Sequence, residues 1–117
     1  MMNKEGARME ELKIYFQYDT ELSEFEAVQK GYRVDVFVKV NNQYFNLRVF
    51  DIIRLRQEFE SEIQSGGYYA IEPNLVLVKE ASKKEIIFTI ENLYKQKYFE
   101  ELKPVDNIKT EDLIEIQ

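Results

Sequence analysis

Four carboxylates stand close together near the start of the chain, with no basic residue among them. They are Asp19, Glu21, Glu24 and Glu26. Carboxylate oxygens are the ligands that hard cations such as Ca²⁺ prefer, but this segment lacks the spaced Asp or Asn and the glycine of a calcium loop. We expect no metal site here. Two interpretations stay open, a solvated acidic segment and a patch that faces a partner.

The usual residues of nucleophilic catalysis are missing. The chain contains no histidine and no cysteine, so a serine would have no imidazole to activate it and no thiolate could replace it. None of the serines lies in a G-x-S-x-G sequence (Ser23, Ser61, Ser65 and Ser82). Gly66-Gly67 is followed by no lysine and no helical pattern, so it predicts the end of a helix and not a phosphate loop. We therefore expect neither an enzyme nor a cofactor.

Length and charge restrict the function further. At 117 residues the chain predicts one domain, with an ordered core of about 12–103 and an acidic tail of 104–117. The 22 acidic and 16 basic residues give a net charge of −6. This charge argues against nucleic-acid binding, which needs a basic surface, and weakly favours a partner with a basic surface.

The N-terminal residues and the hydropathy of the chain predict the cellular compartment of the protein. Residues 1–11 contain no apolar core of a signal peptide, and we expect at most a helical turn around Met9. No apolar run reaches the ~18 residues that a membrane span needs. The absence of cysteine fits a reducing compartment. We therefore expect a soluble cytoplasmic protein that does not bind membranes.

The clearest structural pattern is a hairpin over residues 32–50. Apolar side chains alternate on both sides of Asn41-Asn42, as in strands with one buried face. Asparagine tolerates the positive φ of a two-residue turn. A turn at this place predicts three facing pairs: Val38 with Phe45, Val36 with Leu47 and Val34 with Val49. It also places Asp35 opposite Arg48 on the other face.

The other segments predict the remaining elements. Residues 12–18 alternate as a strand, and 19–30 suit either a short helix or a loop held by Leu22, Phe25 and Val28. A helix beginning at the N-cap Asp51 carries one apolar stripe, formed by Ile52, Leu55, Phe59 and Ile63.

Residues beyond that helix predict one more strand and one more helix. A strand over 71–79 is apolar on both sides at Leu75–Val78, which indicates an inner strand. Ser82 and Glu85 form a capping box for a helix that ends near Lys97, although the β-branched run after it leaves a strand possible. Residues 113–116 either add an edge strand or hang free.

The order β-β-β-α-β-α predicts an α+β two-layer sandwich. We expect a four-stranded, mainly antiparallel sheet with two helices on one face. The other sheet face then carries Tyr15, Phe37, Tyr44 and Arg48, and tyrosine and arginine are enriched at interface hot spots. Cross-strand pairing alone also explains such aromatics.

The chain resembles the small immunity proteins of bacterial polymorphic toxin systems, of the type called immunity protein 8. The resemblance covers about Tyr15 to Leu102 and rests on element order and on the segments FDIIRL, YYAIEPNLVLVKE and ASKKEIIFTIENL. It implies a cytoplasmic, acidic, non-enzymatic protein that binds and blocks a cognate toxin.

The sequence therefore predicts a protein-binding protein, with a basic toxin domain as the candidate partner. The residues expected at the contact are Asp19, Glu21, Glu24 and Glu26, with Tyr15, Phe37, Tyr44 and Arg48 as anchors. The alternative is a small structural or homo-oligomerising module whose outer sheet face is a self-interface. A monomer and a homodimer both remain open.

Overall fold

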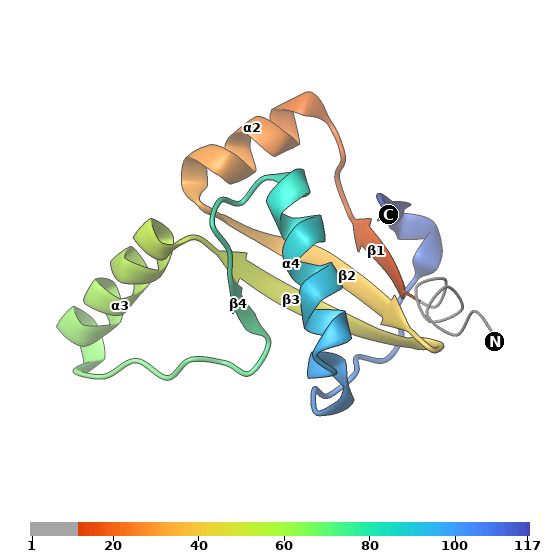
Figure 1. The fold of residues 1–117 in the computed structure, drawn as a ribbon. Helices are drawn as coiled ribbons and strands as arrows, with labels where there is room; N and C mark the ends of the chain where they lie inside the picture. The colour runs from red at the N-terminus through yellow and green to blue at the C-terminus, as the bar shows by residue number, and fades with distance from the viewer. Residues whose placement is uncertain (1–11) are drawn as a thin grey trace.

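The computed structural model describes residues 12–117, which form an α+β fold with a five-stranded mixed sheet and three α-helices (Figure 1). The helical turn expected around Met9 lies outside the described residues. In chain order the elements are β1 (Leu12–Phe16), α2 (Glu21–Lys30), β2 (Tyr32–Val40), β3 (Gln43–Phe50), α3 (Ile52–Gly66), β4 (Leu75–Leu77), α4 (Lys83–Lys95), the 3₁₀ turns η1 (Tyr98–Glu100) and η2 (Thr110–Asp112), and β5 (Ile114–Glu115).

The strands lie in the order β4-β3-β2-β1-β5. β4 runs parallel to β3, and the other pairs are antiparallel. The α+β class is thus confirmed, but the sheet has five strands and not four, and the helices number three because residues 19–30 contain α2. β4 is an edge strand of three residues, so the prediction of an inner strand was wrong. The acidic tail supplies β5.

The hairpin between β2 and β3 closes as predicted at its turn. Asn41 and Asn42 both have positive φ, 52° and 71°. Val38 pairs with Phe45 and Val36 with Leu47. Positive φ at two adjacent asparagines is the backbone that a tight two-residue turn requires.

The register changes farther along the hairpin, between Arg33 and Val36. Because of this bulge Val49 faces Arg33, and Val34 is 47% exposed. The predicted pair of Val34 with Val49 was therefore wrong. The predicted pair of Asp35 with Arg48 was also wrong, since Asp35 binds a residue of its own strand.

That residue is Arg33, whose guanidinium lies 2.8 Å from the Asp35 carboxylate and 3.8 Å from the centre of the Phe16 ring. The same carboxylate accepts the backbone N–H groups of Gln17 and Tyr18 at 3.0 and 3.2 Å. A bulge leaves backbone groups and side chains outside the regular ladder. Here the bulge directs the side chains of Arg33 and Asp35 into the protein, where Asp35 binds the backbone that follows β1.

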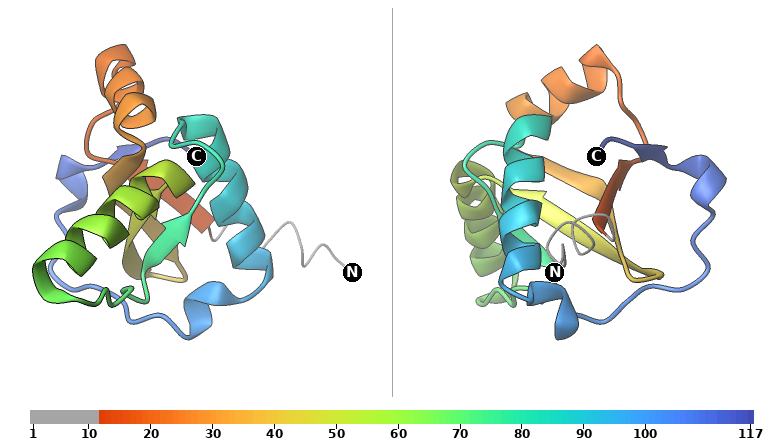
Figure 2. Two further views of the ribbon diagram at one scale, coloured as in Figure 1. Left: turned by 90° about the vertical axis from the view of Figure 1, so that its left-hand side faces the viewer. Right: turned by 45° about the vertical axis from the view of Figure 1, so that its right-hand side comes forward.

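The hydrophobic core lies between the sheet and α4. α4 lies over the sheet (Figure 1). Its residues Ile86 and Ile90 are buried in one cluster with residues of the three central strands and β4. The members of this cluster are Leu12, Ile14, Phe16, Val36, Val38, Phe45, Leu47, Val49, Val76, Val78, Ile86, Ile90 and Phe99. On the opposite face, the C-terminal segment crosses the sheet from β3 to β1 (Figure 2).

Polar caps define the ends of the helices. Thr20, Asp51 and Ser82 each accept a backbone N–H of the first turn of α2, α3 and α4. The caps at Asp51 and Ser82 were predicted. Gly31 and Gly67 end α2 and α3 with φ of 79° and 84°.

α3 extends away from the rest of the molecule (Figures 1 and 2). None of its fifteen residues is buried. The apolar stripe predicted from the sequence is present, but the expectation that it packs on the sheet as one of two covering helices was wrong. We call residues 52–74, which comprise α3 and the loop that returns to β4, the α3 arm.

Candidate functional site

Two of the four clustered carboxylates have partners within the fold. Asp19 lies 2.6 Å from the ammonium of Lys83. Both oxygens of Glu24 accept the backbone N–H of Lys83, the first residue of α4, at 3.0 and 3.1 Å. A carboxylate at this position satisfies a free amide and opposes the positive end of the helix dipole. Asp19 and Glu24 therefore hold α2 against α4.

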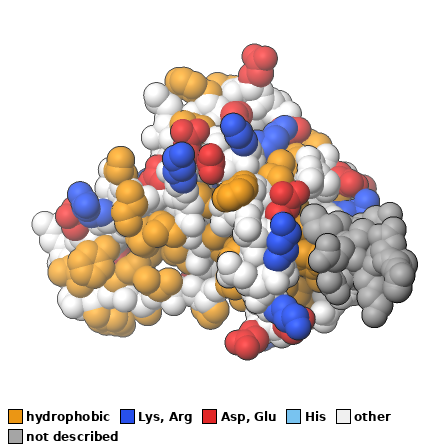
Figure 3. All heavy atoms as spheres, viewed as in Figure 1, with side chains coloured by type: hydrophobic (Ala, Val, Ile, Leu, Met, Phe, Trp, Pro, Cys, Tyr) orange, Lys and Arg blue, Asp and Glu red, His pale blue; other side chains and the backbone are white. Residues whose placement is uncertain are grey.

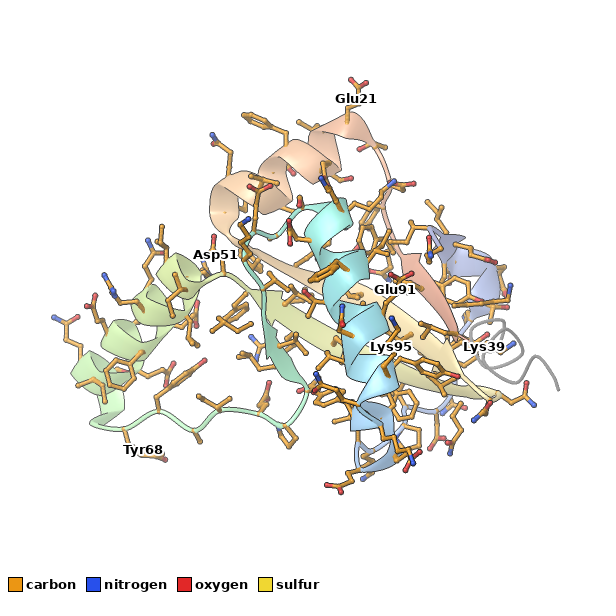
Figure 4. All side chains as sticks on the ribbon, in the orientation of Figure 1. Glu21, Lys39, Asp51, Tyr68, Glu91 and Lys95 are labelled. Atoms are coloured by element: carbon orange, nitrogen blue, oxygen red, sulfur yellow. The ribbon has the colours of Figure 1, made fainter. Side chains whose placement is uncertain are left out.

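The other two carboxylates, Glu21 and Glu26, are exposed. Figure 4 shows Glu21 at the start of α2, pointing away from the molecule. Within residues 12–117 neither carboxylate has an ion-pair partner. Their direct neighbours in the sequence of α2, Leu22 and Phe25, are 65% and 60% exposed. The sequence placed both among the side chains that hold this segment, whereas the buried residue of α2 is Ala27. We call Glu21, Leu22, Phe25 and Glu26 the α2 face.

The aromatic residues predicted on the outer sheet face do come together. Tyr15 and Tyr44 have ring centres 6.1 Å apart, and Phe37 is the direct strand neighbour of Tyr15. All three are half-buried. The backbone N–H of Val105 donates to the carbonyl of Tyr44 at 2.8 Å, so the C-terminal segment joins this side of the molecule.

Burial raises the pKa of Tyr15 to about 12, and the nearby Tyr44 and the negative charge of Glu115 add to the shift. A phenol that stays neutral far above neutral pH is a poor general base. This cluster therefore has the character of a packed cross-strand group.

Arg48 lies apart from these aromatics, at the edge next to the α3 arm. It pairs with Glu72 and lies 5.3 Å from the centre of the Phe50 ring. Together with residues of the arm it lines a hollow of about 420 Å³. The lining residues are Arg48, Glu58, Glu62, Gly66, Tyr68, Tyr69, Ala70 and Glu72.

The eight predicted contact residues thus occupy four separate places. Asp19 and Glu24 hold α2 against the start of α4. Two carboxylates remain free on the α2 face, three aromatics form a half-buried group on the sheet, and Arg48 belongs to the hollow at the arm. The structure does not assemble them into one site.

The sequence reading missed the exposed apolar surface of the α3 arm, because the same stripe is typical of a helix that packs on its own sheet. Figure 3 shows hydrophobic side chains gathered over α3 and the following loop. Tyr68, labelled in Figure 4, points away from the molecule. The exposed apolar residues of the arm are Ile52, Ile53, Phe59, Ile63, Tyr68 and Ile71. The sequence does contain one sign of this exposed surface. Along α3 the arginines come before the glutamates, which is the opposite of the charge order that stabilises a helix.

Two kinds of site find no support in the part of the chain that the structure describes. Residues 12–117 contain no cluster of three or more acidic, histidine or cysteine side chains able to hold a metal ion. No helix in that range has the length and hydrophobicity required to cross a membrane. Comparison of the chain with known families, characterised proteins and solved structures finds no match.

Proposed function

We propose that this protein acts by stoichiometric binding of another protein, without catalysis, and that the α2 face is the contact surface. The observation behind the proposal is that Leu22 and Phe25 are 65% and 60% exposed between two carboxylates that have no partner in residues 12–117. Apolar side chains at the centre of a polar rim are the usual arrangement of a protein interface.

The charges favour a basic partner. Glu21 and Glu26 add to a chain with a net charge of −6, and complementary charge accelerates association with a basic surface. Because the chain resembles toxin immunity proteins, we propose that the partner is a basic toxin domain and that binding takes place in the cytoplasm.

Co-expression tests the proposed role. The protein encoded by the neighbouring gene is produced in a heterologous bacterium, alone and together with this chain. We expect it to arrest growth when alone and to be harmless in the presence of this chain, with both proteins eluting as one complex. A neighbouring product that is harmless when alone, or toxic in both cells, would count against the immunity role.

Substitutions test the contact surface. Changing Glu21 and Glu26 together to Lys should slow association with the isolated toxin, and the loss should shrink as salt is added. Changing Glu100 and Glu101 to Lys makes the same charge change at exposed positions outside α2 and is the matched control. Equal effects of the two double variants would show that only net charge matters and would overturn the α2 face as the contact.

A further inference from the structure

The rest of the described chain leaves most of the α3 arm uncovered. α4, of similar length, buries Ile86 and Ile90, whereas α3 buries none of its residues. Ile52, Ile53 and Phe59 are 56%, 64% and 48% exposed. Apolar surface of this extent on one element indicates a contact with another chain.

The charges of α3 run against the dipole of the helix. Arg54 and Arg56 lie near its start, and Glu58, Glu60 and Glu62 follow them toward its C-terminus. A helix is stabilised by acidic residues at its N-terminus and basic residues at its C-terminus. α2 and α4 follow that rule in their first and last turns, whereas α3 has neither feature. The charge order of α3 thus does not serve the helix itself.

The exposed side of α3 carries a symmetrical pattern. Ile53, Arg56, Glu60 and Ile63 follow one another at steps of three, four and three residues, which places them along one side of a helix. All four are exposed. The pattern begins and ends with an isoleucine. The two residues between the isoleucines are charged, and their charges are opposite.

The inner two charges of this pattern find no oppositely charged partner in residues 12–117. On the side toward the sheet, Arg54 already binds Glu58 at 2.8 Å and lies over the ring of Tyr32. Arg56 and Glu60, by contrast, have no ion-pair partner among residues 12–117. They are four residues apart in the less favourable order, with the base before the acid.

We propose that α3 pairs with α3 of a second copy of this chain, antiparallel, about a two-fold axis at the level of Glu58. In this register Ile53 of each copy faces Ile63 of the other. Arg56 of each copy likewise faces Glu60 of the other. A two-fold axis makes every such contact twice, as in the isologous interfaces of most homodimers.

Three properties favour a second copy as the occupant. Antiparallel pairing places the arginines of one helix near the glutamates and the negative dipole end of the other. With two arginines and three glutamates, α3 is nearly neutral although the chain carries −6, so repulsion at the seam is small. The outer sheet face, the self-interface considered from the sequence, is crossed by the C-terminal segment of the same chain (Figure 2). The pairing does not depend on the α2 face or on a toxin.

Light scattering of the purified chain tests the pairing. We expect a dimer at micromolar concentration. Arg56→Glu and Glu60→Arg should each weaken self-association by about tenfold, because each creates two like-charge contacts across the axis. An equimolar mixture of the two variants should restore the dimer, since every facing pair is then opposite in charge. An unchanged circular dichroism spectrum of both variants shows that the fold of each chain is intact.

Cross-linking tests the orientation. The chain has no cysteine, so single cysteines report without interference. A mixture of Ile53→Cys and Ile63→Cys should form a disulfide between copies on oxidation. Ile53→Cys alone should not, because in the antiparallel pair the two positions lie about 15 Å apart along the axis. A chain that stays monomeric, a mixture that fails to recover the dimer, or a self-linked Ile53→Cys would each overturn the proposal.

Discussion

The guanidinium of Arg33 lies 2.8 Å from the carboxylate of Asp35, two residues away in the same strand, and both side chains are almost completely buried. Two backbone N–H groups from the end of β1 complete the coordination of the carboxylate. Buried ion pairs of this kind are costly to break, because the remaining charge keeps its desolvation penalty. The pair therefore fixes the bulge in β2 and the turn that leads into α2.

Asp35→Ala should destabilise the fold by about 3–5 kcal/mol, because Arg33 loses its counter-ion in a buried place. Chemical denaturation measures the change. Asp106→Ala, at an exposed position, is the control and should have little effect. A loss below about 1 kcal/mol for Asp35→Ala would indicate that water reaches Arg33 and that the pair does not hold the bulge.

The bulge also predicts opposite outcomes for two neighbouring valines. Val36→Asp should unfold the protein, since Val36 is fully buried and an unpaired charge there costs several kcal/mol. Val34→Asp should cost less than about 1 kcal/mol, because the register shift leaves Val34 47% exposed. Thermal unfolding of the two variants checks this. Similar losses at both positions would mean that β2 runs without a bulge.

Two glycines should respond in opposite ways to alanine. Gly31 has φ of 79°, and an added methyl carbon would lie 2.6 Å from the Asp51 carboxylate that caps α3. Gly31→Ala should cost about 2 kcal/mol or more through strain and loss of the cap. Gly66→Ala adds its methyl group to open space at the end of α3 and should stabilise by roughly 0.5–1 kcal/mol. Urea denaturation of both variants gives the comparison, and a tolerated Gly31→Ala would contradict it.

Two carboxylates of α2 should differ in their contribution to stability, since Glu24 binds α4 and Glu26 is exposed. Glu24→Ala should cost about 1–2 kcal/mol, because it removes the acceptor from the start of α4. Glu26→Ala should change stability by less than about 0.5 kcal/mol. Denaturant midpoints report both values. If Glu26→Ala proved equally damaging, Glu26 would be part of the fold and unavailable to a partner.

The stability of the protein should fall at high pH through Tyr15. Its pKa in the folded protein is about 12, raised from 10.0 by burial and by Tyr44 and Glu115. Since the folded state holds this proton more tightly than the unfolded state, the contribution is complete below pH 10.0 and is lost as pH rises toward 12.

Tyr15→Phe is the test of this linkage. Its stability should decline less steeply than that of the unchanged chain between pH 10.0 and about 12. The tyrosinate absorbance of the folded variant should also lack the phenol that titrates near pH 12. Identical declines in the two proteins would assign the effect to other groups.

Local patterns predicted the parts of the fold that depend on near neighbours. The Asn41-Asn42 turn and the caps at Asp51 and Ser82 each need only a few adjacent residues, so sequence alone located them. The bulge could not be located in this way. It exists because Asp35 finds the backbone of Gln17 and Tyr18, which lie 18 and 17 residues away in the chain.

The candidate surfaces were predictable only in part. Uncompensated charge pointed to the segment of Glu21 and Glu26, but the same reasoning included Glu24, whose partner in α4 lies 59 residues away. The stripe of α3 was visible in the sequence. Its spacing says which residues share one side of the helix, but not whether that side meets the same chain or another one.

The addition of β5 to the edge of the sheet, next to β1, has a consequence for the order of folding. The Ile116 N–H donates to the Ile14 carbonyl at 2.8 Å, and Lys13 pairs with Glu115, 102 residues away. Contacts across so long a loop carry a large entropic cost, and they form after local ones. The β2–β3 hairpin, closed over two residues, can form early. In hydrogen exchange the Ile116 amide should therefore open locally while Val38 exchanges only on global unfolding. β1, the first strand of the described residues, is therefore the last strand to gain both of its neighbours.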